Sequence, residues 1–462
     1  MSTFLKLGML GDRSGILFCA ALGVATAAVL GLRLRSERSP QLPAILATVD
    51  TQKTYQSITG FGASTAYYQD WLVAHPQREA IYAALYSELR LDILRLRNTY
   101  EAGKPHFAAV EKEIFDGATH VLGHPPLVMI SSWSPPAALK SLGQTRNGGT
   151  LTRRGGSYDY VGFAHWWRDS VVAYQQLGLS PDYVSIQNEP DWKAEWETCL
   201  FQPQETAQFA SYSKALVAVS GALKTLPAPP KLIGPETLGV DNPQAFLPTN
   251  QTHLVDAVAH HLYKGGDESD PDSFNPQLHA IRDHYPRTPK FQTEFGRGDG
   301  FLTAWLIHNC LTEEDASAYL HWAAVWPDHE ALITLNSPWS TSSWKTPQGF
   351  QRTDRFFALK HYSRFLKPGF IRVGIQAPAA ELRLSAFLSP DGTQLVVVGL
   401  NTSELRTIPV GLGASGFVIQ ERYRTDFKRQ ENCKALAADD EKRSLVLPPH
   451  ALATWVLSKD AP

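Results

Sequence analysis

The pattern of apolar and polar positions changes along this chain of 462 residues. From about residue 57 to 326, short apolar runs alternate with longer stretches whose apolar positions recur at helical spacing. This alternation predicts parallel strands joined by covering helices. Eight such units are what a closed (β/α)8 barrel requires, so the fold class expected is α/β, a TIM barrel. The predicted strands are 57–63, 93–98, 127–133, 183–188, 231–235, 257–262, 290–295 and 323–326.

The helical stretches between these strands include residues 77–89, 158–176 and 204–223. Thr312-Glu-Glu-Asp315 supplies a capping residue and early acidic side chains, a pattern typical of a helix N-terminus. We therefore expect a further helix to begin there, before the last predicted barrel strand.

After about Pro368 the apolar runs become short and alternating, which predicts an all-β module. The predicted strands are 382–387, 394–400, 407–412, 417–423 and 444–446, with turns such as Pro390-Asp-Gly392 between them. Residues just before the first barrel strand also alternate and are expected to pair with this module. The predicted organisation is a linker over 39–47, a joining strand or strands over 48–57, a catalytic barrel over 58–366 and a β-sandwich side domain over 367–460.

Residues 1–38 carry the features of an export signal. Lys6 and Arg13 precede an uncharged apolar run of 18 residues, 15–32, with Ala25-Thr26-Ala27 as a small-residue cleavage site. The run is also just long enough to span a bilayer if it stays uncut. The sequence therefore predicts an exported chain, extracellular or periplasmic, and leaves open whether residues 1–38 are a cleaved signal peptide or an N-terminal membrane anchor.

Composition narrows the function classes. Charge is nearly balanced, with 43 basic and 45 acidic side chains, and no basic patch indicates a nucleic-acid partner. Four cysteines, one of them inside the apolar run, show no metal-ligand or disulfide-scaffold spacing. The 12 Trp, 16 Tyr and 21 Phe residues suit either core packing or a groove that binds sugars, and composition does not separate the two.

Two glutamates stand where predicted strands give way to loops. Ser185-Ile-Gln-Asn-Glu-Pro190 and Phe291-Gln-Thr-Glu-Phe-Gly296 are apolar strand runs that lead to Glu189 and Glu294. A parallel barrel gathers its strand ends on one face, so carboxylates about a hundred residues apart can meet there. A glycosidase needs one carboxylic acid to protonate the leaving oxygen and one carboxylate to attack the anomeric carbon. Either glutamate alone would be interpreted as a solvated loop residue, but the pair indicates a glycosidase.

Six short motifs follow one another along the predicted barrel. They are Ile58-Thr-Gly-Phe-Gly-Ala-Ser64, Leu94-Arg-Leu-Arg97, Ser131-Ser-Trp-Ser-Pro-Pro136, Asn147-Gly-Gly149, Gln187-Asn-Glu-Pro-Asp-Trp192 and Thr293-Glu-Phe-Gly296. Together they resemble glycoside hydrolase family 30, and the resemblance runs from about residue 48 to 458. The tail segments 363–369 and 447–455 resemble that family's passage into its β side domain and the last strands of that domain.

The resemblance implies a (β/α)8 barrel fused to a β side domain that takes strands from both ends of the chain. It also implies a retaining β-glycosidase, with Glu189 as acid/base after the fourth strand and Glu294 as nucleophile after the seventh. By the same resemblance, Asn188 would donate to the sugar 2-hydroxyl and an arginine would lie beside the nucleophile. Arg95 and Arg97 share a strand face, and we assign this role to Arg97 because it is nearer the C-terminal end.

Further residues near the strand ends are candidate sugar contacts. The adjacent His260 and His261 point to opposite faces of a strand and make poor joint metal ligands, so no metal or cofactor is expected. The remaining substrate-binding candidates are His261, Tyr263 as a hydrogen-bond donor to the nucleophile, Trp133 and Trp326 as sugar platforms, Trp192 and Arg297.

Within the family, Gln187–Trp192 followed by Trp196-Glu-Thr-Cys199 is most similar to the xylanase branch. The sequence therefore predicts an endo-1,4-β-xylanase or glucuronoxylanase that acts as a monomer on polysaccharide or oligosaccharide. Arg297, Lys345 and Arg352 are available to bind a glucuronate branch. However, the stretch 336–349 departs from the pattern of the bacterial glucuronoxylanases. The alternatives left open are a β-1,6-glucanase, a glucosylceramidase-like exo-β-glycosidase and a non-catalytic carbohydrate-binding barrel.

Overall fold

The computed structural model describes residues 44–327, 330–335, 349–437 and 445–460. The predicted signal or anchor segment, Lys345 and nearly all of the stretch 336–349 lie outside these ranges. Within them, no helix combines the length and the apolar composition that crossing a bilayer requires.

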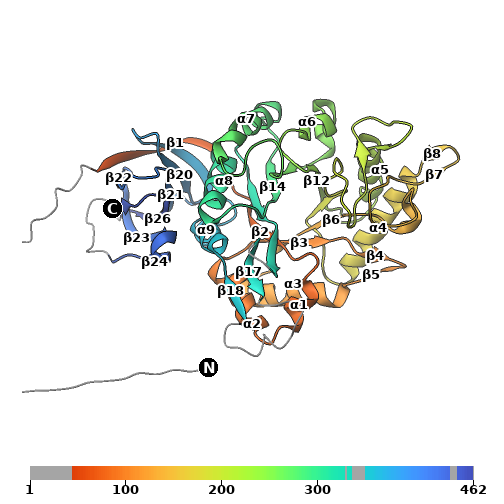
Figure 1. Ribbon diagram of the computed structural model, residues 1–462, viewed down its shortest axis with the longest axis horizontal. Helices are drawn as coiled ribbons and strands as arrows, with labels where there is room; N and C mark the ends of the chain where they lie inside the picture. Colours follow the sequence, from red (N-terminus) through yellow and green to blue (C-terminus); the bar gives the residue numbers. More distant parts are fainter. Residues whose placement is uncertain (1–43, 328–329, 336–348, 438–444, 461–462) are drawn as a thin grey trace, which may run out of the picture. The chain divides into compact units, whose positions relative to one another are not determined.

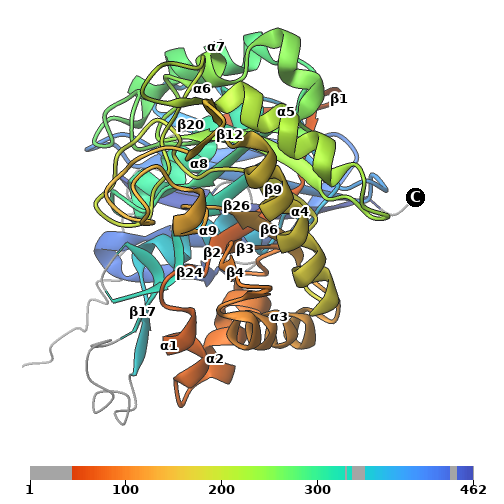
Figure 2. The same ribbon diagram turned by 90° about the vertical axis from the view of Figure 1, so that its right-hand side faces the viewer.

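The centre of the molecule is a closed barrel of eight parallel strands, which confirms the predicted fold class (Figures 1 and 2). All five residues of several of these strands are buried, as expected where a barrel interior and a ring of helices cover both faces. In barrel order the strands are β2 (Gly60–Ser64), β3 (Ile93–Arg97), β6 (Leu127–Ser131), β9 (Tyr183–Ser185), β12 (Lys231–Thr237), β13 (Ala257–His261), β14 (Lys290–Glu294) and β15 (Ala318–His321).

Helices follow every barrel strand and pack around the barrel. Figure 2 shows α3, α4 and α5 following one another around one side of the barrel. The helices are α1 (Gln69–Ala74), α2 (Arg78–Tyr82) with its π-helical continuation η1 (Ala83–Glu88), α3 (Ala108–Leu122), α4 (Tyr160–Gln176), α5 (Tyr212–Leu223), α6 (Pro243–Phe246), α7 (Asn275–His284), α8 (Gly300–Thr312) and α9 (Asp354–Ser363).

The eighth barrel strand lies earlier in the chain than the sequence predicts. Residues 323–326 form β16 (Ala323–Trp326), which belongs to a separate sheet with β17 (Ala331–Leu335) and β18 (Phe350–Arg352). The barrel is closed instead by β15, which pairs with β2 from Ala318↔Gly60 to His321↔Ala63. Both segments are short apolar runs, and only pairing with the first strand distinguishes them.

The helix expected to begin at Thr312 ends there instead. Helix α8 starts after Asp299, whose side chain accepts a hydrogen bond from the Leu302 amide at 2.8 Å. The polar residues after Thr312 therefore connect α8 to β15. A cluster of threonine and acidic residues can stand at either end of a helix. The preceding segment gives no amphipathic pattern to decide between them, because α8 is buried on nearly every side.

The C-terminal module is a nine-stranded sheet, and it includes the N-terminal strand as predicted. Strand β1 begins at Ile45, so the last residues of the predicted linker belong to the sheet. Its order is β24 (Glu431–Ala435), β23 (Phe417–Asp426), β26 (Ala451–Lys459), β21 (Gln394–Asn401), β20 (Leu382–Leu388), β19 (Ile371–Gln376), β1 (Ile45–Ser57), β22 (Ile408–Gly413) and β25 (Leu445–Leu447).

Alternation along β21 shows how this sheet meets the barrel. Val396 and Val398 belong to the main core of the barrel and its helices, whereas Leu395 and Val397 belong to the core of the side domain. The buried His361 of α9 links the two parts, since its ring nitrogens bond the hydroxyls of Thr454 at 2.8 Å and Thr425 at 2.7 Å. The side domain is thus fixed to the barrel by apolar packing and by polar contacts from α9.

Shorter elements border the loops of the barrel. They are β4 (Tyr100–Glu101), β5 (Lys104–Pro105), η2 (Ala137–Leu139), β7 (Arg153–Arg154), β8 (Ser157–Tyr158), β10 (Phe201–Gln202), β11 (Ala210–Ser211), η3 (Thr249–Leu254), η4 (Pro271–Phe274) and, in the side domain, η6 (Phe427–Arg429).

Candidate active site

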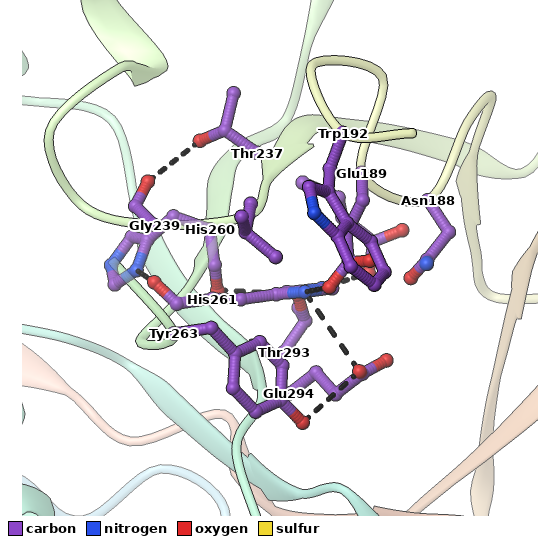
Figure 3. Close-up of polar contacts among 12 residues, drawn as sticks. Asn188, Glu189, Trp192, Thr237, Gly239, His260, His261, Tyr263, Thr293 and Glu294 are labelled. Carbon is purple, nitrogen blue, oxygen red and sulfur yellow. Dashed lines mark hydrogen bonds and ion pairs between the residues drawn. The ribbon is translucent and has the colours of Figure 1, made fainter. Parts of the chain in front are cut away.

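Glu189, His261 and Glu294 converge at the C-terminal ends of three barrel strands. Glu294 is the last residue of β14, His261 is the last residue of β13, and Glu189 lies on the loop after β9. A carboxylate oxygen of each glutamate and a ring nitrogen of His261 all lie within 4.8 Å of one another. Figure 3 shows the imidazole between the two carboxylates. The barrel thus brings together the two glutamates that the sequence singled out.

Glu189 is held from two sides in a buried position. Its amide donates to the Glu236 carbonyl at 2.9 Å, and its Oε1 lies 3.0 Å from His261 Nδ1. The residue is 7% exposed and adopts a φ of +48°, a backbone conformation uncommon for non-glycine residues. Burial, together with the nearby charge of Glu294, raises the pKa of Glu189, although the hydrogen bond from His261 opposes this. Its environment therefore favours a protonated carboxyl group.

Glu294 receives hydrogen bonds from two donors. Arg95 Nη1 lies 2.5 Å from Glu294 Oε2, and the Tyr263 hydroxyl donates to Oε1 at 3.2 Å. A charge-assisted hydrogen bond from a guanidinium and a neutral one from a phenol both stabilise a carboxylate. Glu294 is thus surrounded by donors, whereas burial raises the pKa of Glu189. The two carboxyl groups therefore have different environments, which is the asymmetry that a nucleophile and an acid require.

The assignment of Arg97 to the position beside the nucleophile is wrong, because Arg95 lies there. Arg95 is fully buried, and its Nη2 also donates to Asn188 Oδ1 at 2.7 Å and Glu236 Oε1 at 3.1 Å. Arg97 lies two residues further along β3, towards the C-terminal end of the strand, where it forms an ion pair with Glu197. Both arginines share a strand face, so the choice depends on depth in the barrel, and the carboxylates lie at the deeper level.

Glu236, from the end of β12, completes a buried charged layer that the sequence analysis missed. It accepts from Arg95, and its Oε1 lies 3.8 Å from His261 Nε2. Burial alone would lower the pKa of His261, but the surrounding carboxylates raise it to about 9, so the imidazole is protonated at neutral pH. Arg95 and His261 thus place two positive charges next to the buried Glu236. A lone acidic residue directly after the apolar run 232–235 was the available signal.

This layer predicts a pH window of stability. Burial opposes ionisation of Glu236, but Arg95 and His261 lower its pKa from 4.5 to about 2, so its stabilising contribution is lost as pH falls below 4.5 towards 2. The contribution of His261 is complete below 6.5 and is lost as pH rises through about 9. We expect Glu236→Gln to reduce the unfolding free energy by about 3 kcal/mol or more near pH 5.5.

Thermal unfolding from pH 3 to 9 would measure this effect. The difference in melting temperature between the unaltered chain and Glu236→Gln should become smaller as the pH falls below 4.5. Glu268→Gln, on an exposed loop, is the matched control and should leave the melting profile unchanged. A difference that stays constant down to pH 3 would contradict the assignment of this charge layer.

The two adjacent histidines face different surroundings, as expected for neighbours on a strand. His260 Nε2 lies 2.8 Å from Glu314 in a fully buried pair, whereas His261 joins the carboxylates. The spacing of Glu189, His261 and Glu294 could accommodate a metal ion. However, a protonated His261 and the guanidinium of Arg95 place two positive charges against these carboxylates, so the geometry suits acid–base chemistry better than a divalent cation.

A cavity of about 690 Å³ opens above the two glutamates, large enough for a saccharide. Aromatic side chains surround it, and its aromatic lining is Tyr67, Tyr68, Trp71, Trp133, Trp192, Trp196, Tyr263, Trp322 and Trp326. The sequence-predicted residues on its wall are Trp133, Glu189, Trp192, Tyr263, Glu294, Arg297 and Trp326. Asn188 and His261 lie buried behind this wall.

Several cavity residues were missed because their segments carry no motif. Tyr67 and Tyr68 come from the loop after β2, Trp71 comes from α1, and Trp322 follows β15. The high aromatic count was the available signal, but it suits core packing as well as a sugar-binding groove. Of the three cations predicted at a glucuronate site, Lys345 lies outside the described residues. Arg297 lines the cavity, with its guanidinium 5.2 Å from the Tyr263 ring centroid, whereas Arg352 pairs with Glu88.

The chain is similar along most of its length to known glycoside hydrolases. It is 24% identical over 393 residues to the glucuronoxylanase XynC of Bacillus subtilis (strain 168). The aligned region covers 81% of this chain and 82% of that protein. It is 23% identical over 412 residues to a putative glucosylceramidase 2 of Caenorhabditis elegans, with 78% and 77% covered. No family model matches.

A solved structure supports the fold. The catalytic domain of the glycoside hydrolase family 30 xylanase C from Talaromyces cellulolyticus superimposes with a TM-score of 0.71 at 19% identity. The match covers 90% of this chain and 100% of the xylanase C chain. It therefore includes the side domain as well as the barrel.

Proposed function

From the premise that this chain belongs to glycoside hydrolase family 30, we propose that it is a retaining β-glycosidase that cleaves the β-1,4 linkages of xylan in an endo fashion. The observation that carries the retaining mechanism is the approach of the Glu189 and Glu294 carboxylates to within 4.8 Å. Retaining glycosidases hold their carboxyl groups about 5–5.5 Å apart, whereas inverting enzymes need about 6.5–9.5 Å to admit a water molecule.

In the first step, a Glu294 oxygen forms a bond to the anomeric carbon as the bond to the leaving oxygen breaks. Glu189 gives its proton to that oxygen, so the leaving group departs as an alcohol. Glu294 is then esterified and its negative charge is gone. In the second step, Glu189 removes a proton from water, which attacks the anomeric carbon and releases Glu294 as a carboxylate. Both displacements invert the carbon, so the configuration is retained.

Arg95 positions two of the participating groups in this mechanism. It bonds Glu294, and it also bonds Asn188 Oδ1 at 2.7 Å. With Oδ1 engaged as an acceptor, the Asn188 amide nitrogen remains available as a donor. This supports a hydrogen bond from Asn188 to the sugar 2-hydroxyl, which strengthens in an oxocarbenium-like transition state.

Similarity to proteins named as xylanases supports xylan as the substrate class. The aromatic wall of the cavity provides flat surfaces on which pyranose rings can stack. Half-exposed Trp196 packs against Trp192 with ring centroids 5.2 Å apart, on the same loop as the acid Glu189. The aromatic surface therefore extends along the loop that carries the acid, which favours binding of several sugar rings and so supports endo cleavage of a long chain.

Product analysis on glucuronoxylan, linear xylan and arabinoxylan tests the substrate. We expect a ladder of oligosaccharides from xylan, with the β-configuration of the new reducing end visible by proton NMR before mutarotation. Acidic oligomers released from glucuronoxylan alone would show dependence on a glucuronate branch. Release of glucose from an aryl β-glucoside without any cleavage of xylan would favour the glucosylceramidase-like alternative, and cleavage of β-1,6-glucan alone would favour a glucanase.

We propose that the chain is exported and acts as a monomer. Export is supported by the apolar run 15–32 and by the polymeric nature of the proposed substrate, which a cell cannot import intact. Fractionation of the producing cells, followed by N-terminal sequencing of the active form, would distinguish cleavage after Ala27 from retention of an anchor.

A further inference from the structure

A second cavity lies beside the first on the same face of the barrel. Its volume is about 360 Å³, and its lining comes from the loops after β3, β6 and β9. Trp133 lines both cavities. The loop after β9 also borders both, since Trp192 and Trp196 face the first cavity and Glu197 the second. The two spaces are therefore separated by little more than a wall of side chains.

That wall has Arg97 at its centre. The Arg97 guanidinium lies 4.5 Å from the ring centroid of Tyr67, which faces the first cavity, and 5.6 Å from that of Phe107, which faces the second. Its ion pair with Glu197 links the end of β3 to the loop that carries Glu189. Arg97 is buried, and these contacts let it position the wall.

The lining of the second cavity combines aromatic rings with free polar groups. Tyr100, Phe107 and Trp133 offer apolar surface. Within the part of the chain that the structure describes, the side chains of His106 and Thr145 make no hydrogen bond. Rings that stack and polar groups that donate or accept are the combination by which proteins bind sugars.

Charge around the second cavity disfavours an acidic ligand. Among its described lining residues, Arg97 is the one arginine or lysine, and Glu197 already neutralises it. Glu101 adds a further carboxylate that is exposed and unpaired within the described residues. A uronate carboxylate placed here would face Glu101 without a cation to bind it.

We propose that this second cavity is a subsite for an uncharged glycosyl residue of the same polysaccharide whose linkage is cleaved in the first cavity. This inference rests on the proposed function, since it assumes a carbohydrate substrate. The residue could belong to the main chain or be a neutral branch such as a pentose. The chemistry that recognises it is the same in both cases, and the experiment separates them.

Thr145→Trp fills the second cavity and leaves the catalytic groups untouched. In the inactive Glu294→Gln background, calorimetry would compare binding of a linear xylo-oligosaccharide and of one with a single arabinofuranosyl branch. We expect Thr145→Trp to weaken binding at least about tenfold. Loss for both ligands identifies a main-chain residue, and loss for the branched ligand alone identifies a branch. His106→Ala, a milder change at an exposed residue, should weaken the same ligands by about fivefold.

Hydrolysis of an aryl β-xyloside by the otherwise unaltered Thr145→Trp chain should be unchanged, since that substrate occupies the first cavity alone. Val161→Trp, at an exposed position on α4, is the matched control for added bulk. Unchanged affinity of both oligosaccharides in Thr145→Trp and His106→Ala would overturn the subsite while leaving the proposed function intact. Weaker binding of a glucuronate-branched ligand alone would overturn its neutral character. Failure of the unaltered chain to cleave any xyloside would remove both proposals.

Discussion

Glu294→Gln is expected to lower kcat for xylan and for aryl β-xylosides by about 10⁴-fold or more. The amide cannot form the glycosyl ester, and it also removes the negative charge that stabilises a developing oxocarbenium ion. Glutamine has the size of glutamate and keeps most of its hydrogen-bonding geometry. The substrate affinity of Glu294→Gln should therefore stay close to that of the unaltered chain. Initial rates on both substrate types and calorimetric binding of an oligosaccharide would measure the two quantities separately.

Glu268→Gln, an exposed substitution of the same type, should retain full activity. Undiminished hydrolysis by Glu294→Gln would refute the nucleophile assignment. Trapping with a 2-fluoro glycoside provides an independent readout, because the unaltered chain should gain the mass of one glycosyl group on the peptide that contains Glu294.

Glu189→Ala is expected to lower kcat/KM for xylan by about 10²–10⁴-fold, because departure of a sugar alkoxide requires a proton. An aryl xyloside whose phenol leaves without protonation should lose much less in this first step. The glycosyl-enzyme should then accumulate, because no base activates water. Added azide should restore turnover and give a β-glycosyl azide, a product that a structural defect would not yield.

The pH profile offers a second test of Glu189. Burial, with a contribution from the charge of Glu294, raises the pKa of Glu189, so kcat/KM of the unaltered chain should fall on the alkaline side as this group loses its proton. That alkaline limb should be absent in Glu189→Ala with an activated aryl substrate. Glu195→Gln, exposed on the same loop, should keep the limb unchanged. Persistence of the limb in Glu189→Ala would assign it to a different group.

The barrel could be predicted because each strand carries its own apolar signal, but its closure could not. Residues 318–321 and 323–326 are both short apolar runs, and the first closes the barrel because it pairs with β2. Likewise, the segment before Thr312 forms α8, whose start Asp299 caps, so the polar residues after Thr312 follow the helix instead of opening one. Such choices depend on which segment gains a partner across the sheet, a contact between residues far apart in sequence.

The depth of a side chain in the barrel could not be predicted from the sequence either. Arg95 and Arg97 have the same side-chain direction, and proximity to the strand end favoured Arg97, yet the carboxylate of Glu294 lies at the level of Arg95. Glu236 was missed because the strand that carries it has no recognisable motif, and its importance arises from contacts with Arg95 and His261.

The amino-acid sequence by itself determined the α/β barrel and the all-β module with its N-terminal strand, and it singled out Glu189 and Glu294 as the proposed pair of acids. These follow from periodicity and from residues next to one another in the chain, which local physical chemistry governs. Only the tertiary structure decided which arginine bonds the nucleophile, how Glu236 and His261 balance the buried charges, and that Arg97 separates two cavities. Those features depend on distances across the barrel, where burial removes water and makes each charge depend on its neighbours.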